Sequence, residues 1–445
     1  MAAGTAIRVA GALLKAAGVA FLCVLVGCSS SPSDQGQALR FVTWKPDQPE
    51  VWDEAVRRFE RAHPDIPVTR EVGPHSSTAF HDLVTQKLKN RDPGIDVYFL
   101  DVVWLAEFAA AGWTLPLESR FGERQQSEFL EGTIRASTWQ GRVNAVPAFI
   151  DAGMLYFRKD LLEKYHVPVP TTWSQLDAAA RRIVAAERPS QPGLLGYSGQ
   201  FKQYEGLVCD LLEFVTAKGG RFVDDQATRA TLSEPPTIEA IRWVRDQVIG
   251  GIAPRSVLTY QEPESLALFL QGLAVFHRNW PYAWDVSNDE RQSRVAGKVG
   301  IAPLPGFGEG AGRSALGGWL YGISSYSRHA DAAWKFVEYM STTANSEWCE
   351  AVGQVPANTE AAKASWVQQS QPLKAIVETS KNPKTQYLQL PTYLPDWGKI
   401  LKTEMEPDFQ KVLQKQLSAQ AFADKYAARF EQAKKEYDAS LKGGK

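Results

Sequence analysis

The sequence predicts an α/β protein of two lobes, each a mostly parallel sheet flanked by helices, joined by extended strands. The chain has 445 residues, too many for a single compact core, so two or three domains are expected. Apolar residues between 41 and 111 alternate between strand and helix spacing. An extended segment at 143–157, in which Pro147 and Gly153 oppose a helix, then leads into a second region that is mainly helical.

The first 28 residues have the pattern of a bacterial export signal. Arg8 and Lys15 give a sparse positive start, and the apolar run at 16–26 is short for a membrane span. The segment ends in Leu-Val-Gly-Cys at 25–28, which resembles the lipobox of bacterial lipoproteins, and the polar stretch after it suits a tether. We therefore expect 1–28 to be a lipoprotein signal with Cys28 acylated, and 29–38 to be a flexible tether. An ordinary signal followed by an incidental cysteine is the alternative.

The region after the tether alternates short strands with helices. The apolar run at 95–100 is nearly continuous, as expected of a strand buried on both faces of a parallel sheet. Trp52, Val56 and Phe59 recur at helical spacing behind Pro49, which a first helical turn tolerates. The expected elements are strands at 41–44, 67–72 and 95–100 and helices at 49–59, 80–88 and 102–111.

Two acids follow strands of this region, at the end of the sheet where open α/β folds bind their ligands. Asp101 ends the third strand, and Glu50 comes shortly after the first. A carboxylate in such a place can accept hydrogen bonds from ligand hydroxyls. The structural alternatives are that Asp101 caps the following helix and that Glu50 is a favourable acid in a first helical turn.

The chain beyond the first region is mainly helical. Asp151 is a lone acid in the extended crossing, so it is either held by structural hydrogen bonds or faces a cleft. The expected helices are at 173–186, 204–217, 237–249, 264–271, 330–340 and 422–441, with strands at 273–276, 299–304 and 321–324. The last helix repeats apolar residues every three or four positions and should dock one face on the body, through Phe422, Tyr426, Phe430, Ala433, Tyr437 and Leu441.

Two aromatic segments follow strands in the second half of the chain. Residues 277–284 read His-Arg-Asn-Trp-Pro-Tyr-Ala-Trp, directly after the apolar run at 273–276. Residues 316–321 again place a Trp beside glycines, which let backbone approach a partner closely. Indole and phenol rings stack on the apolar faces of sugar rings, and their N–H or O–H adds a polar contact. These segments predict a carbohydrate site that includes Trp280 and Trp319, unless the aromatics simply fill the core.

The composition narrows the classes of partner. The chain has 49 basic and 50 acidic residues and no long run of one sign, so a nucleic acid is not expected. Once the signal is removed, Cys209 and Cys349 remain, too few for a disulfide framework, and both are expected as buried thiols. No pattern suggests a metal, a cofactor or catalysis. Gly-Tyr-Ser-Gly at 196–199 lacks the last glycine of a nucleophile elbow, and the six His show no ligand spacing.

Six segments together resemble the extracytoplasmic solute-binding proteins of sugar ABC importers, and most closely their trehalose/maltose-binding branch. They are the lipobox and residues 99–113, 156–165, 203–210, 278–284 and 316–319. The resemblance covers essentially the whole mature chain in the same order. It implies a two-lobed fold in which the chain crosses between the lobes several times. The lobes close over a sugar, and a transporter reads the closed form.

The resemblance also implies where the lobes and the ligand lie. The N-terminal lobe is expected to comprise 39–148 with 299–343, and the C-terminal lobe 149–298 with 344–445. The ligand is expected to be an α-linked disaccharide, trehalose or maltose, with glucosylglycerol or a larger oligosaccharide as alternatives. The protein is expected to be a monomer, lipid-anchored at the cell membrane and facing the periplasm or the exterior, that delivers the sugar to permease subunits. The implied ligand-binding residues are Glu50, Asp101, Trp104, Asp151, Trp280, Tyr282, Gly318 and Trp319.

The sequence departs from that branch in three places. Phe149 stands where the branch tends to carry a Tyr, residues 76–81 lack the arginines that it supplies to the ligand, and no C-terminal contacting Arg is evident near Tyr393 and Trp397. These changes could alter which disaccharide is preferred. We expect binding rather than catalysis. A glycoside hydrolase that uses Asp101 and Asp151 is the enzymatic alternative, and a surface adhesin or structural lipoprotein with core aromatics is a third class.

Overall fold

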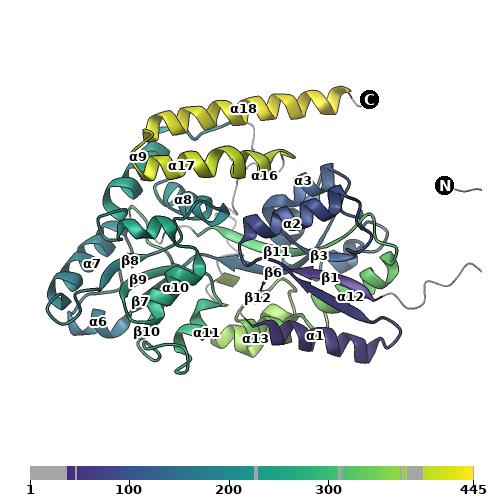
Figure 1. The fold of residues 1–445 in the computed structure, drawn as a ribbon, viewed down its shortest axis with the longest axis horizontal. Helices are drawn as coiled ribbons and strands as arrows, with labels where there is room; N and C mark the ends of the chain where they lie inside the picture. Colours follow the sequence, from purple (N-terminus) through teal and green to yellow (C-terminus); the bar gives the residue numbers. More distant parts are fainter. Residues whose placement is uncertain are drawn as a thin grey trace, which may run out of the picture. The chain divides into compact units, whose positions relative to one another are not determined.

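Two β-sheets, each flanked by helices, form two lobes (Figure 1). The computed structural model describes residues 38–443, apart from 46–47, 225–228, 309–311, 313, 371–372, 375 and 378–393. The expected signal peptide, Cys28 and most of the expected tether therefore lie outside the described residues.

The first sheet has six strands in the order β12, β6, β11, β3, β1, β2. The three strands expected near the start of the chain are among them, and Phe41 of β1 packs against Phe99 of β3 with ring centroids 5.3 Å apart. The six strands are β1 (Leu39–Thr43), β2 (Val68–Val72), β3 (Val97–Asp101), β6 (Val146–Ala152), β11 (Leu316–Ile323) and β12 (Val355–Pro356).

Helices cover both faces of the first sheet. In Figure 1, α2 and α3 lie on one side of it and α1, α12 and α13 on the other, where α1 contacts both α12 and α13. Helix α1 buries Trp52, Ala55, Val56 and Phe59, the spacing that predicted it. The helices are α1 (Pro49–Ala62), α2 (Ser77–Lys89), α3 (Leu105–Ala110), α4 (Glu123–Gln126), α5 (Glu131–Ala136), α12 (Ala330–Ser341) and α13 (Asn345–Val352).

The second sheet has four strands in the order β10, β7, β9, β8. Helices α7 and α10 pack against it. Its strands are β7 (Met154–Arg158), β8 (Leu195–Ser198), β9 (Ala274–Asn279) and β10 (Val299–Ala302). The helices of this region are α6 (Lys159–Lys164), α7 (Trp173–Glu187), α8 (Glu205–Ala217), α9 (Pro235–Trp243, continued by a π-helical turn at Val244–Val248), α10 (Glu262–Leu270) and α11 (Ala283–Asn288).

Two strand connections between the sheets lie side by side. Gly153 alone separates β6 of the first sheet from β7 of the second. The segment that returns from β10 to β11 runs antiparallel to it, with Leu316 paired with Ala152 and the Gly153 amide 3.3 Å from the Ala315 carbonyl oxygen. The expected extended crossing at 143–157 is therefore confirmed, and a second crossing is hydrogen-bonded to it.

Both sheets are mixed rather than mostly parallel, which corrects the prediction. In the first sheet β1 pairs with β2 and β3 in parallel, but β11 is antiparallel to β3 and β6, and β12 is antiparallel to β6. In the second sheet the β8–β9 pair is parallel, and β7 is antiparallel to both β9 and β10. The β-α-β order of the first 110 residues correctly predicts parallel pairs. The strands that cross between sheets return in the opposite direction, and their apolar pattern does not reveal this.

Two expected lobe boundaries also differ from the strand pairing. Strand β10 was expected in the first lobe, but it pairs with β7 of the second sheet. Helix α13 and strand β12 were expected in the second lobe, but α13 contacts α1 and β12 pairs with β6 of the first sheet. A strand's apolar pattern shows that it is buried without showing which neighbour it pairs with.

The end of the chain is helical, as expected. Helix α17 contacts α8, and α18 lies along α17 and reaches α9 (Figure 1). Phe422, Tyr426 and Phe430 of α18 are buried, whereas Leu441 is 47% exposed and is not part of the docked face. Among the described residues, no helix combines the length and apolar character that crossing a membrane requires. Further elements are the hairpin β4 (Thr138–Trp139) and β5 (Arg142–Val143) and the α-helices α14 (Ser365–Gln369), α16 (Trp397–Ile400), α17 (Glu406–Leu413) and α18 (Ala419–Gly443).

Candidate ligand-binding site

The register of strand β11 brings three candidate residues onto one face of the first sheet. Trp319 is paired with Asp101 of β3, and Gly317 is paired with Asp151 of β6. Paired residues share a face, and so do residues two apart along a strand, so both carboxylates lie on the same face as the indole. Gly318 between them cannot carry a side chain, because a Cβ there would lie 2.6 Å from the Phe149 carbonyl oxygen.

These residues line a cavity whose other wall comes from the second sheet. The cavity contains about 1180 Å³ of space, its open mouth included. The wall from the first sheet and its helices includes Trp44, Trp52, Ser77, Asp101, Phe149, Asp151, Gly317, Gly318 and Trp319. The wall from the second includes Tyr204, Glu205, Cys209, Glu262, Trp280 and Tyr282.

The first wall is a cluster of aromatic rings. Trp44 stacks on Trp319 with ring centroids 4.5 Å apart and planes 28° apart, and Trp52 meets Trp44 edge-on at 6.1 Å. Trp104 lies behind this surface, where its ring meets Trp319 edge-on at 5.4 Å. Trp44 therefore covers one face of the Trp319 indole, and Trp104 packs perpendicular to it.

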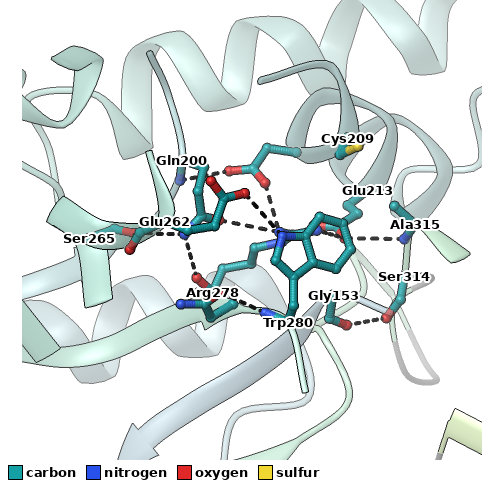
Figure 2. A network of polar contacts seen from close by, with 12 residues as sticks. Gly153, Gln200, Cys209, Glu213, Glu262, Ser265, Arg278, Trp280, Ser314 and Ala315 are labelled. Carbon is teal, nitrogen blue, oxygen red and sulfur yellow. Dashed lines mark hydrogen bonds and ion pairs between the residues drawn. The ribbon is translucent and has the colours of Figure 1, made fainter. Parts of the chain in front are cut away.

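The second wall is held by charged and polar groups. Trp280 follows strand β9, and the Arg278 guanidinium lies 3.8 Å from the centroid of its ring (Figure 2). The Trp280 Nε1–H donates to Glu262 Oε1 at 3.1 Å, and the Tyr204 hydroxyl donates to the same oxygen at 2.8 Å. The Tyr156 hydroxyl donates to the Trp280 carbonyl oxygen at 2.7 Å. One ring face, the ring N–H and the backbone of Trp280 are thus all fixed by the protein.

The carboxylates in the cavity are poorly solvated. Burial, and then the charge of Glu205, raises the pKa of Asp101 well above its usual range, although its Oδ1 accepts a hydrogen bond from the Val103 amide at 3.1 Å. Burial also raises the pKa of Asp151, against the opposing charge of Arg278. Asp151 Oδ1 is buried and accepts no hydrogen bond from the described residues. A ligand that brings hydroxyl donors would satisfy these oxygens.

The structure tests the structural alternatives for the candidate acids. Asp101 both caps the turn that follows it and lines the cavity, so its two suggested roles are compatible. Glu50 is exposed in the first turn of α1 and does not line the cavity. Trp104 is 3% exposed and also lies outside the lining. The structure thus brings together Asp101, Asp151, Trp280, Tyr282, Gly318 and Trp319 but not Glu50 or Trp104.

Comparison with known proteins identifies the family. A model of the bacterial extracellular solute-binding protein family matches residues 45–347, more than half of the chain. The chain belongs to this family. A probable ABC transporter-binding protein of Deinococcus radiodurans is 35% identical to this solute-binding protein over 269 residues, which are 60% of this chain and 63% of the relative, so the alignment spans less than two thirds of that relative.

Two further relatives differ in the ligand that their names state. The structure of maltose-bound MalE3 from T. maritima is 31% identical, covers 88% of this chain and 99% of its own, and superposes with a TM-score of 0.79. The mannitol-binding protein of Pseudomonas aeruginosa is 25% identical over 318 residues, 69% of this chain and 70% of the relative. The first comparison confirms the two-lobed fold of this solute-binding protein.

Several lining residues of this solute-binding protein were not predicted. The sequence predicts Trp44 and Trp52 only as parts of a strand and a helix, and it predicts no ligand-binding role for Glu205 or Glu262. Both acids stand in the first turns of helices that face the cavity, as Glu50 stands in the first turn of α1. The same reasoning, applied to every acid at a helix start, would have found them.

The segment that lacks the expected arginines bridges the two walls instead. The Ser77 hydroxyl donates to Glu205 Oε2 at 3.2 Å, and the Glu205 amide donates to the Thr78 hydroxyl oxygen at 3.3 Å. Trp397 is 1% exposed and does not line the cavity, and Tyr393 lies outside the described residues. Cys209 and Cys349 are buried free thiols, as expected, and no group of metal-ligating side chains occurs in the part of the chain that the structure describes.

Proposed function

We propose that this solute-binding protein is the sugar-binding component of an ABC importer, which takes a sugar of disaccharide size between its two lobes. The cavity carries the proposal, because its two walls come from different sheets and together supply indole faces and poorly solvated carboxylates. Sugars present both apolar C–H faces and hydroxyl donors, which match these two kinds of group. Membership of the solute-binding protein family also supports a role in binding a solute for import.

Each wall has a distinct role in this proposal. Trp280 and Trp319 each have one ring face covered by protein, by Arg278 and Trp44 respectively, and both residues line the cavity in which a sugar would lie. Asp101 and Asp151 accept hydroxyl hydrogens beside Trp319. Because the ligand touches both walls, it binds the closed arrangement of the lobes better than an open one and shifts the population toward closure.

Trehalose and maltose are the first candidates for the ligand. The maltose-bound relative, 31% identical over most of this chain, supports an α-linked glucose disaccharide. Glucosylglycerol or a larger oligosaccharide is the alternative, and the mannitol-binding relative adds a sugar alcohol to the compounds worth testing. Phe149 lines the cavity with no hydroxyl to offer, so ligands that depend on a donor at that point are disfavoured.

A thermal-shift panel tests the proposal. Trehalose, maltose, glucosylglycerol, maltotriose and mannitol are each added at millimolar concentration. A sugar that binds only the folded protein raises the melting temperature by mass action. The Trp280→Ala/Trp319→Ala double variant is the control and should show no shift. Small-angle scattering should show compaction with the best ligand, and the absence of any shift or compaction across the panel contradicts the proposal. Release of product from a chromogenic glucoside would instead indicate a hydrolase.

The proposal includes a lipid anchor and a permease partner. Acylated Cys28 would tie the protein to the cell membrane on its periplasmic or outer side, where a monomer could deliver sugar to the membrane subunits. Substitution Cys28→Ser should release the protein from the membrane fraction into the soluble fraction, as measured by immunoblotting. Retention of the variant in the membrane fraction contradicts the anchor.

A further inference from the structure

A buried ion pair lies directly beneath Trp280. The Arg278 guanidinium stacks on the indole and forms two hydrogen bonds with Glu213, Nε to Oε2 at 2.9 Å and Nη2 to Oε1 at 2.5 Å (Figure 2). Both side chains are almost completely buried, at 1% and 3% exposure. Neither lines the cavity. The pair therefore supports the ring from outside the space that a ligand would occupy.

The same ion pair touches both crossings between the sheets. Glu213 Oε1 accepts a hydrogen bond from the Ala315 amide at 3.1 Å, in the segment that leads into β11. A Cβ on Gly153, in the β6–β7 crossing, would lie 2.0 Å from Glu213 Oε1 and 2.6 Å from Arg278 Nη2. The Ser314 hydroxyl then joins the two crossings by donating to the Gly153 carbonyl oxygen at 2.6 Å. The absence of a side chain at Gly153 is what lets the crossing lie against the pair.

Further contacts leave Arg278 little freedom to move. Its Nη1 donates to Gln200 Oε1 at 3.3 Å, and Asp210 Oδ1 is 3.2 Å from its Nε. Asp210 is itself fixed, because its Oδ2 accepts from the Gln200 amide at 3.1 Å. A buried ion pair adds little net stability compared with apolar packing, because desolvation offsets the attraction. The geometry of the pair suggests a different role. The planar Arg278 guanidinium holds the Trp280 ring and the Glu213 carboxylate in a fixed orientation relative to each other.

We propose that Arg278 and Glu213 are positioning residues that fix the plane of Trp280 relative to the two crossings. This inference rests on the proposed function, in which the sugar stacks on the Trp280 indole ring. The ion pair touches no ligand. It sets the affinity by holding the Trp280 ring in one orientation before the ligand arrives, and it connects that ring to both crossings.

A fluorescence measurement without ligand tests whether Arg278 and Glu213 position the Trp280 ring. The emission of Trp280 is isolated as the difference between each protein and the same protein carrying Trp280→Phe, and its quenching by acrylamide is measured. Arg278→Lys retains the charge but loses the planar cover of the ring, so the quenching constant of Trp280 should rise about twofold. The matched control is Arg158→Lys, a buried arginine of the same sheet that pairs with Asp160. It should leave the constant unchanged.

The crossing is tested through Gly153→Ala, which forces Glu213 to move and should raise the quenching of Trp280 in the same way. Gly193→Ala is its control, because the nearest atom to a Cβ there is 4.0 Å away. Unchanged quenching in either Arg278→Lys or Gly153→Ala overturns the proposal. If Arg278→Lys does not fold, the Gly153→Ala and Gly193→Ala pair decides alone.

Calorimetry with maltose and trehalose then measures whether the positioning of Trp280 affects the affinity for sugar. The affinity of Arg278→Lys should be about tenfold weaker than that of Arg158→Lys. Equal affinities overturn the positioning role even if quenching changes. If the wild-type protein binds no sugar of the panel, the proposed function fails, and the quenching comparison still decides whether the ion pair positions Trp280.

Discussion

The two walls of the cavity are built in different ways. The wall from the first sheet is a set of indole and phenyl rings that pack on one another, with Trp44 and Trp319 stacked at 4.5 Å. The wall from the second sheet is a hydrogen-bonded network in which one indole, Trp280, rests on Arg278 and Glu262. The first wall is therefore supported as a core is, by close packing, and the second by charges.

The two kinds of support predict different responses of the walls to amino-acid substitution and to pH. Aromatic packing is local and not ionised, so its loss opens space without leaving an unpaired charge. The network around Arg278 pairs one cation with two carboxylates, Asp210 and Glu213, so removal of the cation leaves both uncompensated. The second wall should be the more sensitive to single substitutions and to pH.

The largest expected effect is on the second wall. Arg278→Met removes the cation that Asp210 and Glu213 share and should lower the free energy of unfolding by about 3–5 kcal/mol. Urea denaturation measures this loss. The first-wall counterpart, Trp44→Phe, keeps an aromatic ring in the stack and should cost less than about 2 kcal/mol. Equal losses in the two variants would show that the walls do not differ in their support.

The two indoles provide the second comparison. Trp280→Ala and Trp319→Ala should each weaken sugar binding by about 2 kcal/mol or more, as for an aromatic anchor of an interface. Trp319→Ala should also lower stability by about 3 kcal/mol, because its ring packs against Trp44 and Trp104. Trp280→Ala should lower stability by only about 1–2 kcal/mol, since it loses a cation contact and one hydrogen bond. Calorimetry and denaturation of the same samples separate the two quantities, and unchanged affinity in both variants would discard the stacking model.

The contrast between the walls also explains what the sequence could predict. Trp280 and Trp319 stand beside Pro281 and Gly318, local signals that mark them as unusual, and both line the cavity. Trp44 and Trp104 carry no such signal, and only the three-dimensional packing places the first on the surface of the cavity and the second behind it. Element positions near the start were predictable because helix and strand periods are local.

Apart from the helix-start acids Glu205 and Glu262, the main unpredicted features depend on contacts distant in sequence. The Arg278 network joins β9 to α8, 65 residues away, and to the segment before β11. The pairing of β10 with β7 joins residues about 140 apart, and it places β10 in the second sheet. Register and ion pairing are settled by the whole fold, whereas a sequence pattern reports only that a segment is buried or charged.

A buried acid outside the cavity walls should also make stability depend on pH. Glu406, at the start of α17, is 2% exposed, and burial followed by the charge of Glu205 raises its pKa from 4.5 to about 8, against the opposing charge of Lys402. Between these two values the folded protein holds a proton that the unfolded chain has lost, so stability falls as the pH rises through this window. Glu406→Gln should remove this fall and therefore be more stable than the wild type at pH 8.

Denaturation of wild type and Glu406→Gln at pH 5 and pH 8 measures the effect. Trp44→Phe is the comparison from the aromatic wall and should keep the wild-type difference between the two pH values. A Glu406→Gln variant that retains the wild-type pH dependence would assign it to another group, such as Glu205, whose pKa burial also raises.

The smallest expected effect concerns Asp151, where the two walls meet. Burial raises the pKa of this carboxyl group, although the charge of Arg278 opposes the rise, and its Oδ1 has no donor among the described residues. Asp151→Asn keeps the shape and should leave the melting temperature unchanged or slightly raised at neutral pH. A sugar hydroxyl bonds more strongly to a carboxylate than to an amide oxygen, so affinity should fall by about 1 kcal/mol. Thermal melting and calorimetry provide the two values. If the variant melts early and binds normally, Asp151 serves the fold of the crossing strand and not the ligand.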